Sequence, residues 1–512
     1  MTTTMTSVIN RIVSTAPSGG TISFARLDGT ETIGLPELYE RAGRLAGHLR
    51  DRGVGPGDRI GILAANSLEW VLLDLAALRL KAQTAGFEPG KFDPADDLAG
   101  RYGLTMLFTD RPTDSHRSMP MSEVRALSEP AVRPDEAAAP APVTWAPRDV
   151  TTIKFTSGST GTPKGLGATA GSIDSSLAAV QEIFGHAPGD DLFVFLPLSL
   201  LQQRYWVYSA LAHGHDVTIS TYEAAFAALR RVKPTVVMGV PAFYETAKRQ
   251  VESRVRRSGG TATAGDAARH LFGDRIRYLW TGSAPADAAM LRFFTDAGLP
   301  IYEGYGLNET CIVAKNHPGA TREGSVGRVL PGKQVLLDED GVVSVRSEHP
   351  VGYGYTYAKP GDSERVFDSD GTVRTGDLGY IDDDGFLFIR GRADDVIVLD
   401  NGKKIIVRPL EEHMRTSPAI AECVLFCPTQ TDLVAVVSPA ALPADPDAVL
   451  AQLALTNAAF GRDEQISRVV IADEPFSIGN DLLTSQYKPK RPRILAAYRT
   501  SLHDSKAGIH AP

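Results

Sequence analysis

The alternation of helix and strand patterns constrains the fold of this chain more than any other feature. Residues 35–53 have apolar side chains at helical spacing and end on glycine, and residues 59–67 form an apolar run typical of a buried strand. A helical pattern returns at 69–82, and a strand pattern follows at 105–110. Strands separated by helices predict a parallel sheet wrapped by helices, which is an α/β fold.

The chain continues in three further segments. Pro and Ala dominate residues 128–149, which predicts an exposed linker. Strand patterns separated by helical ones then predict a second wound sheet, and they lie at 193–198, 216–220, 235–240 and 276–280. Beyond about residue 325, short strands alternate with turns such as DEDG and DDDG, and residues 395–512 fit a small α+β domain.

The composition excludes several classes of function. With 512 residues the chain is long enough for two or three domains, and its net charge of -8 argues against nucleic acid as a main partner. Its three cysteines form neither a disulfide framework nor a zinc-ligand pattern. The N-terminus lacks the pattern of a signal peptide and no apolar run is long enough to span a membrane, so a cytoplasmic location is expected. Nothing in the sequence indicates the oligomeric state.

The segment TSGSTGTPKG at 156–165 predicts a phosphate-binding loop. Its glycines let backbone N–H groups approach an anion, its hydroxyls add donors, and its lysine adds positive charge. It is not the G-x-x-x-x-G-K-[ST] loop, because Gly165 follows Lys164 where that motif needs Ser or Thr. A strand is expected before the loop and a helix after it. The predicted binding residues are Thr156, Ser157, Gly158, Ser159, Thr160, Gly161 and Lys164.

Nearly the whole chain resembles the superfamily of acyl-CoA synthetases, peptide-synthetase adenylation domains and luciferases. Five signatures of that superfamily occur in order: TSGSTGTPKG, YGLNET at 305–310, Thr-Gly-Asp at 375–377, GRADD at 391–395 and LLTSQYKPKR at 482–491. The last is similar to the lysine motif of the long-chain fatty acyl-CoA synthetase branch. The resemblance implies an enzyme that activates a small acid with ATP and Mg²⁺, releases pyrophosphate, and transfers the acyl group to CoA or another nucleophile.

The same resemblance implies a fold. A large N-terminal domain, 1–392, would hold two doubly wound αβ subdomains and a distorted β-barrel. A small mobile α+β domain would follow at 395–512, with a hinge near Asp394 and the active site at the junction of the two domains.

Roles for individual residues also follow from the resemblance. Glu309 would hold Mg²⁺, and Asn308 stands beside it where the superfamily usually has Thr or Ser, whose hydroxyl its amide can replace as a donor. Asp377 would accept both ribose hydroxyls of ATP, with Arg392 as a second contact. Tyr305 would stack on adenine. The remaining nucleotide-site residues would be Gly282, Ser283, Ala284, Glu303, Gly304 and Gly306.

Lys488 is the residue predicted to act in catalysis. Attack of an acid on the α-phosphate develops negative charge, which a mobile lysine stabilises. Lys490 is the rival, but the spacing to Arg491 favours Lys488.

The segment LPLSLLQQR at 196–204 departs from the fatty acyl pattern. Leu200 replaces a histidine or gating ring, the polar pair Gln202–Gln203 follows, and Arg204 matches that branch's arginine. These changes suggest a smaller acid and an unusual acceptor. Residues assigned to the substrate pocket, with core packing as the alternative, are Leu200, Arg204, Tyr205, Phe243 and Tyr302.

Three functions remain open from the sequence. The first is a carboxylate–CoA ligase, the commonest type in the superfamily. The second is a diazotase that uses ATP to activate nitrite for attack by an aryl amine, with which Gln202 and Gln203 are compatible. The third is an inactive nucleotide-binding relative with a regulatory role, and the joint retention of Lys164, Glu309 and Lys488 argues against it.

Overall fold

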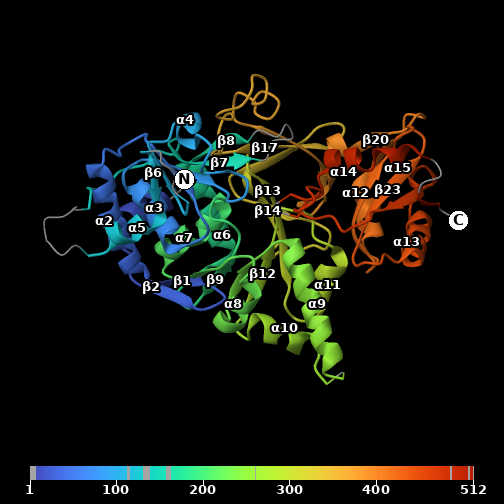
Figure 1. Cartoon of the computed structure of the whole chain (residues 1–512), viewed down its shortest axis with the longest axis horizontal. Coiled ribbons are helices and arrows are strands. Elements are labelled where there is room, and N and C mark those ends of the chain that lie inside the picture. Colours follow the sequence, from blue (N-terminus) through green and yellow to red (C-terminus); the bar gives the residue numbers. More distant parts are fainter. Residues whose placement is uncertain are drawn as a thin grey trace. The chain divides into compact units, whose positions relative to one another are not determined.

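The structure, a computed structural model, describes residues 7–111, 116–130, 139–156, 163–259, 261–484, 487–504 and 508–510 (Figure 1). These residues form two compact units. The first contains the chain up to Ala286 together with Met290–Leu336 and Ser344–Thr375, and the second contains the chain from Gly376 on, with Asp287–Ala289 and Leu337–Val343. The division falls at 375–376, whereas the sequence places the domain boundary near residue 392, which stays a prediction.

One sheet of the first unit runs in the strand order β15-β14-β13-β12-β11-β9-β10-β1-β2. Its strands from β13 to β1 pair in parallel, as the alternating pattern predicts. The bounds are β1 (Thr21–Ala25), β2 (Thr30–Gly34), β9 (Asp191–Val194), β10 (Asp216–Ile219), β11 (Val236–Met238), β12 (Tyr278–Thr281), β13 (Ile301–Leu307), β14 (Cys311–Lys315) and β15 (Gly327–Val329).

A second sheet of the same unit has the order β6-β5-β3-β4-β7-β8. Its bounds are β3 (Arg59–Leu63), β4 (Gln83–Phe87), β5 (Met106–Thr109), β6 (Ser118–Pro120), β7 (Val150–Thr156) and β8 (Lys164–Thr169). The expectation of a helix directly after the phosphate loop is wrong, because antiparallel β8 comes first and α6 (Ala170–Phe184) follows it. Gly165 to Thr169 are all buried, so β8 has no apolar–polar alternation that would reveal a strand.

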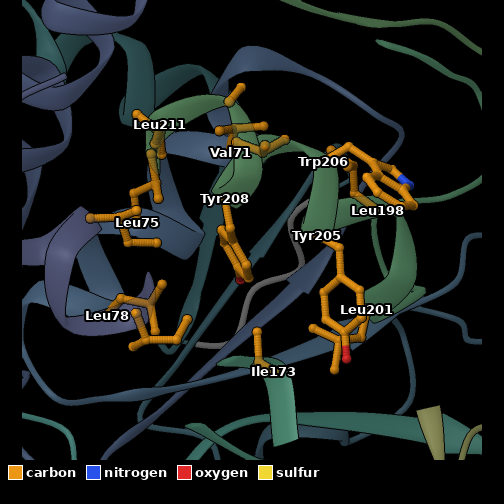
Figure 2. Packing of buried hydrophobic residues seen from close by; sticks show 14 of the residues in the cluster. Val71, Leu75, Leu78, Ile173, Leu198, Leu201, Tyr205, Trp206, Tyr208 and Leu211 are labelled. Atoms are coloured by element: carbon orange, nitrogen blue, oxygen red, sulfur yellow. The ribbon is translucent and has the colours of Figure 1, made fainter. Parts of the chain in front are cut away.

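Helices fill the space between the two sheets. Helix α3 (Leu68–Arg79) contacts β4, α6 contacts β8, and α7 (Leu201–His213) contacts β9 and β10. Figure 2 shows Val71 and Leu75 of α3 in one cluster with Tyr208 and Leu211 of α7. Helix α7 is buried on most of its circumference, which explains why its sequence has no single apolar stripe.

Alternate residues of each strand serve two different cores. Leu192 and Val194 of β9 belong to the core between the sheets, whereas Phe193 points to the opposite face. That opposite face is covered by α8 (Ala225–Val232), α9 (Pro241–Arg257) and α10 (Ala264–Phe272). The other elements of this unit include α1 (Val8–Ser14), α2 (Leu35–Asp51), α4 (Leu98–Tyr102) and α5 (Met121–Ser128).

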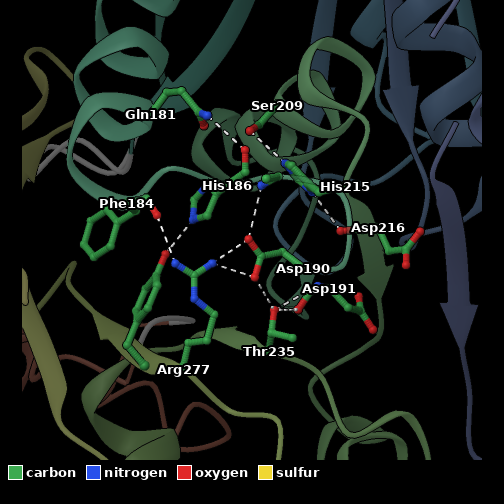
Figure 3. A network of polar contacts seen from close by, with 12 residues as sticks. Gln181, Phe184, His186, Asp190, Asp191, Ser209, His215, Asp216, Thr235 and Arg277 are labelled. Atoms are coloured by element: carbon green, nitrogen blue, oxygen red, sulfur yellow. Dashed lines mark hydrogen bonds and ion pairs between the residues drawn. The ribbon is translucent and has the colours of Figure 1, made fainter. Parts of the chain in front are cut away.

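A polar network that joins buried His186, Asp190 and His215 to the exposed Arg277 lies beside the first sheet (Figure 3). The Arg277 guanidinium donates to the Asp190 carboxylate at 2.5 Å, and His186 Nε2 lies 2.5 Å from the Tyr278 hydroxyl. Burial lowers the pKa of His186 to about 3 and that of His215 to about 4. Both imidazoles are therefore neutral in the folded protein at physiological pH.

The second unit is a smaller α+β arrangement. The turn DDDG joins β18 (Val373–Ile381), which begins in the first unit, to antiparallel β19 (Phe386–Arg392), as expected from the sequence. A sheet of order β22-β23-β24-β25 follows. Its bounds and those of the remaining elements are β16 (Lys333–Leu337), β17 (Val342–Ser347), β20 (Val396–Val398), β21 (Lys404–Ile406), β22 (Ile420–Phe426), β23 (Leu433–Pro439), β24 (Ile466–Ile471), β25 (Ile509–His510), α11 (Ala288–Asp296), α12 (Val407–Met414), α13 (Pro446–Ala459), α14 (Arg491–Ala497) and α15 (Arg499–His503).

Candidate active site

A pocket opens at the carboxyl ends of the parallel strands of the first unit, the edge at which open α/β sheets bind ligands. Residues after β9, β11 and β12 contribute to it, together with residues of β13 and the first turns of α7. We call this the acid pocket. Its lining residues are Leu196, Gln202, Gln203, Trp206, Met238, Gly239, Val240, Trp280, Gly282, Ser283, Gly304, Tyr305, Gly306 and Ile312.

Five residues predicted for the nucleotide site line this pocket: Gly282, Ser283, Gly304, Tyr305 and Gly306. Ser283 has a φ of +70°, a conformation that costs energy for a residue with a side chain. Such a backbone is retained where the surrounding structure requires it, which is common at ligand sites.

Lys315 lies beneath the pocket floor and was not predicted from the sequence. Its side chain is fully buried, and Nζ donates to the carbonyl of Tyr302 at 2.6 Å and stands 3.6 Å from the centre of the Trp280 ring. Burial lowers the pKa of Lys315 well below its usual value, against the opposing attraction of Glu303. A side chain at Gly304 would clash with this lysine, since a Cβ there would lie 2.7 Å from Lys315 Cδ.

Two residues of the first unit that the sequence assigns to phosphate or Mg²⁺ binding, Glu309 and Lys164, have specific partners. Glu309 accepts a hydrogen bond at Oε1 from the Tyr355 hydroxyl at 2.7 Å. Burial raises the pKa of Tyr355, and the adjacent Glu309 carboxylate adds to the shift. Lys164 pairs with Asp362 at 3.1 Å, and the hydrogen bond from Lys164 lowers the pKa of Asp362.

The surroundings of Glu309 fit a magnesium ion that is held mainly by nucleotide phosphates. Among the described residues no group of three or more His, Cys, Asp or Glu side chains could hold a metal. Mg²⁺ in nucleotide sites needs only one or two carboxylates, because phosphate and water oxygens complete its coordination. Glu309 is half-buried in the segment after β13, and its neighbour Asn308 is exposed, with its carbonyl accepting from Lys154.

Asp377 and Arg392 face each other across the β18–β19 hairpin of the second unit. They occupy paired positions in the ladder, and Arg392 Nη1 donates to Asp377 Oδ1 at 3.1 Å. Gly376 has a φ of +72°, and a Cβ there would lie 2.8 Å from Arg392 Nη2. Asp394 follows in a short 3₁₀ turn and accepts from Arg392 Nε at 3.0 Å. The glycine of the Thr-Gly-Asp signature therefore leaves room for the arginine.

Lys488 belongs to the same unit. Burial lowers its pKa, the negative charge of Asp377 opposes that shift, and Arg392 adds to it. Lys490 instead pairs with Asp481 and lies at the surface of the unit. The charges of Asp377 and Arg392 thus act on Lys488, whose catalytic role stays a prediction.

Several predicted residues lie elsewhere. Ser157 to Gly161 and the side chain of Thr156 fall outside the described residues. Ala284 and Glu303 do not line the acid pocket, and the Glu303 carboxylate instead accepts from the Ala286 N–H at 3.0 Å. The five residues assigned to the substrate pocket are not among its lining residues either, and these are Leu200, Arg204, Tyr205, Phe243 and Tyr302.

Packing explains why three of these five residues do not line the pocket, and their assignment to the substrate site stays a prediction. Tyr205 and Phe243 are fully buried, and the Tyr205 hydroxyl lies 2.9 Å from Cys311 Sγ. Arg204 forms a buried ion pair with Asp74 at 2.9 Å. Tyr355, Asp362 and Lys315 were missed because they lie outside the signatures and no local pattern marks them.

Comparison with known proteins agrees with these features. A family model described as AMP-binding enzyme matches residues 16–353, and a model described as AMP-binding enzyme C-terminal domain matches residues 394–472. The long-chain-fatty-acid–CoA ligase FadD15 of Mycobacterium bovis is 31% identical over 437 residues, which cover 73% of this chain and 71% of that protein. The 2-succinylbenzoate–CoA ligase of Bacillus licheniformis is 26% identical, covering 78% of this chain and 82% of that protein.

A solved structure shows the same architecture. It is O-succinylbenzoate Coenzyme A synthetase from Bacillus subtilis in complex with ATP and magnesium ion, with a TM-score of 0.72 at 20% identity over 91% of this chain and 95% of that one. The predicted fold class, a large α/β N-terminal domain followed by a smaller C-terminal domain, is confirmed. Among the described residues, no helix is both long enough and apolar enough to cross a membrane.

Proposed function

The chain belongs to the AMP-binding enzyme family, and from this premise we propose that it activates a small carboxylic acid with ATP as an acyl-adenylate and transfers the acyl group to CoA. Membership confirms the predicted resemblance to the adenylate-forming superfamily and its fatty acyl-CoA synthetase branch. The observation that carries the proposal is the acid pocket, where predicted nucleotide residues Gly282, Ser283 and Tyr305 meet the apolar and amide side chains of α7.

The first half-reaction needs little covalent chemistry from the protein. A carboxylate oxygen attacks the α-phosphorus, a new P–O bond forms, and the bond to the β-phosphate breaks so that pyrophosphate leaves. Asp377 and Arg392 would hold the ribose hydroxyls as acceptor and donor. Lys488 would stabilise the negative charge that develops between carboxylate and phosphate. Mg²⁺, when held through Glu309, would neutralise charge on the phosphates.

The second half-reaction would release AMP. The thiol of CoA loses its proton to solvent, its sulfur attacks the acyl carbon, the C–O bond to phosphate breaks, and AMP leaves with the electron pair. CoA is the acceptor in the names of the FadD15 and 2-succinylbenzoate relatives, which supports it over other nucleophiles. The comparisons give no support to nitrite activation or to an inactive relative. A cytoplasmic location is part of the proposal and is supported by free thiols at Cys311, Cys423 and Cys427.

The test is release of AMP and pyrophosphate by the purified protein with ATP and Mg²⁺ across fatty, aryl and short acids, each with and without CoA, and with nitrite in the presence and absence of an aryl amine. Turnover with a carboxylate and formation of its CoA thioester would support the proposal. Turnover that requires nitrite and an aryl amine would replace the proposal with the diazotase function. If no acid yields AMP, the inactive nucleotide-binding relative would be the remaining function.

Lys488→Ala provides the matched active-site variant, with Lys490→Ala as its control. We expect Lys488→Ala to lower the rate of AMP formation by about 10²–10³-fold, as loss of one charge-stabilising donor does. Lys490→Ala should keep most activity because its partner Asp481 is a surface residue. A fully active Lys488→Ala enzyme would move the catalytic role to Lys490.

A further inference from the structure

One polar group in the acid pocket has no partner among the described residues. Gln203 is only 6% exposed and lines the pocket, yet its side-chain Oε1 makes no hydrogen bond. Buried polar groups in native proteins are almost always hydrogen-bonded, and an unpaired one needs an explanation.

Other buried polar atoms of the described residues are also unpaired, Gln181 Oε1 among them, but of these residues only Gln203 lines the pocket, and a second buried glutamine shows the contacts that such a side chain can make. Gln452 is buried to the same degree in the second unit, and its Nε2 donates to the His413 carbonyl at 2.7 Å and to Thr416 Oγ1 at 3.0 Å. The side chain of Gln203 has no comparable contact. An unsatisfied amide in a pocket is what a site for a polar ligand group requires before the ligand binds.

The walls of the pocket restrict the shape of the ligand. Trp206 and Trp280 form one apolar wall, with ring centroids 5.3 Å apart and planes at 70°. The backbone of Gly282 and Gly304 forms a surface without side chains, and at Gly304 the buried Lys315 leaves no room for one. Aromatic and backbone surfaces of this kind suit a flat ring.

The enclosed part of the pocket is small, which favours a compact acid over a long alkyl chain. Its volume is about 50 Å³, and about 540 Å³ when the open mouth is counted. A cavity that encloses benzene measures about 150 Å³. One ring can therefore bind if part of it occupies the mouth, whereas a fatty acid would leave most of its methylenes outside the enclosed part.

We propose that Gln203 determines which acid is used: the substrate is a compact carboxylic acid of at most one ring that carries an amino or hydroxyl group, and this group donates a hydrogen bond to Gln203 Oε1. The inference rests on the proposed function and names the substrate class of the same site. An acid with a methyl group in that position has the same size but leaves the buried amide unpaired, and sites built for a polar group reject such analogues strongly.

The test compares matched acids: the three aminobenzoates and three hydroxybenzoates against the three methylbenzoates, with benzoate and decanoate. Binding is followed by quenching of tryptophan fluorescence, because Trp206 and Trp280 line the pocket. Turnover is followed by AMP release. For at least one ring position, the amino or hydroxyl acid should have a Kd about ten-fold lower or more, and a kcat/KM about ten-fold higher or more, than the methyl acid with its substituent at the same position.

Gln203→Leu removes the amide and keeps a side chain of similar size. The preference for the amino or hydroxyl acid over the methyl acid should disappear, while resistance to unfolding stays unchanged or increases because an unpaired polar atom is lost. Gln202→Leu is the matched control. Gln202 lines the same pocket but is half-buried, so water can satisfy it, and its replacement should change the preference less than about two-fold.

The outcomes separate the two proposals. Equal binding of amino, hydroxyl and methyl acids, a preference that survives in Gln203→Leu, or binding of decanoate above all others would each overturn the role of Gln203. Selective binding that depends on Gln203 without AMP release would overturn the proposed reaction and support the selectivity. Binding of none of these acids would overturn the inference, and AMP release with some other acid would then still support the reaction.

Discussion

Replacing Arg204 by methionine tests whether this arginine belongs to the core or to the pocket. Arg204 lies on α7, its side chain is 1% exposed, and Nη1 stands 2.9 Å from Asp74 Oδ1, whose side chain is 4% exposed. Its guanidinium also donates to Thr84 Oγ1 at 3.2 Å and to Thr152 Oγ1 at 3.0 Å. These contacts connect α7 to α3 and to two strands of the second sheet.

The expected loss of stability follows from the charge left behind. Without Arg204 the Asp74 carboxylate stays buried, and the Tyr208 hydroxyl at 2.5 Å is its closest remaining donor. Removal of one partner from a buried ion pair costs about 3–5 kcal/mol. The double variant Arg204→Met with Asp74→Leu should recover part of this loss, because apolar replacements of a whole buried pair are often neutral.

Tryptophan fluorescence during urea unfolding is a suitable assay. All four tryptophans of the sequence lie in the first unit, so the signal reports unfolding of the unit that contains the ion pair. They are Trp70, Trp145, Trp206 and Trp280. Arg204→Met with stability within about 1 kcal/mol of the wild type and a selective loss of acid binding would refute the structural role. That result would return Arg204 to the substrate pocket, where the sequence placed it.

Three other outcomes are expected. Between pH 7.5 and 5.5 the unfolded chain protonates His186 and His215 while the folded chain does not, which lowers the free energy of unfolding by about 2.7 kcal/mol. Burial raises the pKa of Asp191 in the folded chain to about 6, so the folded chain takes up a proton there, which raises the free energy of unfolding by about 0.8 kcal/mol. The free energy of unfolding should therefore fall by about 2 kcal/mol over this range. The same urea titration at both pH values, with no such fall, would contradict the conclusion that both histidines are neutral in the folded protein. Gly304→Ala should lower the free energy of unfolding by about 1–3 kcal/mol and abolish most AMP release, because the new Cβ would lie 2.7 Å from Lys315 Cδ. Unchanged stability would show that the lysine side chain moves aside freely. Lys488→Ala should leave the binding of a non-hydrolysable ATP analogue within about two-fold of wild type by calorimetry, and a large loss would show that this lysine binds nucleotide rather than stabilising the transition state.

Sequence patterns predicted the parts of the fold that rest on local periodicity. The parallel strands β3, β10 and β12 and the hairpin of β18 and β19 lie where the patterns placed them, because alternation, apolar runs and DDDG turns depend on neighbouring residues, whereas β9 begins two residues before its predicted range and ends four residues early. β8 was missed since all but its first residue are buried. A strand buried on both faces has no apolar–polar alternation to distinguish it from a glycine-rich loop.

The lining of the pocket, too, could be predicted only in part from local sequence patterns. Gly282, Gly304 and Tyr305, which the resemblance assigns to the nucleotide site, do line the pocket, while their role in nucleotide binding stays a prediction. Arg204 and Gln203 are adjacent on α7, yet one contacts the core and the other lines the pocket. Helix α7 is packed on most sides, so its sequence carries no polar stripe that would show which face meets the ligand.

Two different units hold the side chains proposed to select the acid and the lysine expected to accelerate the reaction. The acid pocket is formed entirely by the first unit, including Gln203 and Trp206, whereas Lys488 belongs to the second. Interactions made equally in the bound and transition states set affinity, while those made only in the transition state set the rate. A change at Gln203 should therefore alter the ranking of acids, whereas a change at Lys488 should slow every acid by the same factor. If the two substitutions act independently, their effects on kcat/KM should add as free energies, and a double-variant cycle measures any departure from additivity.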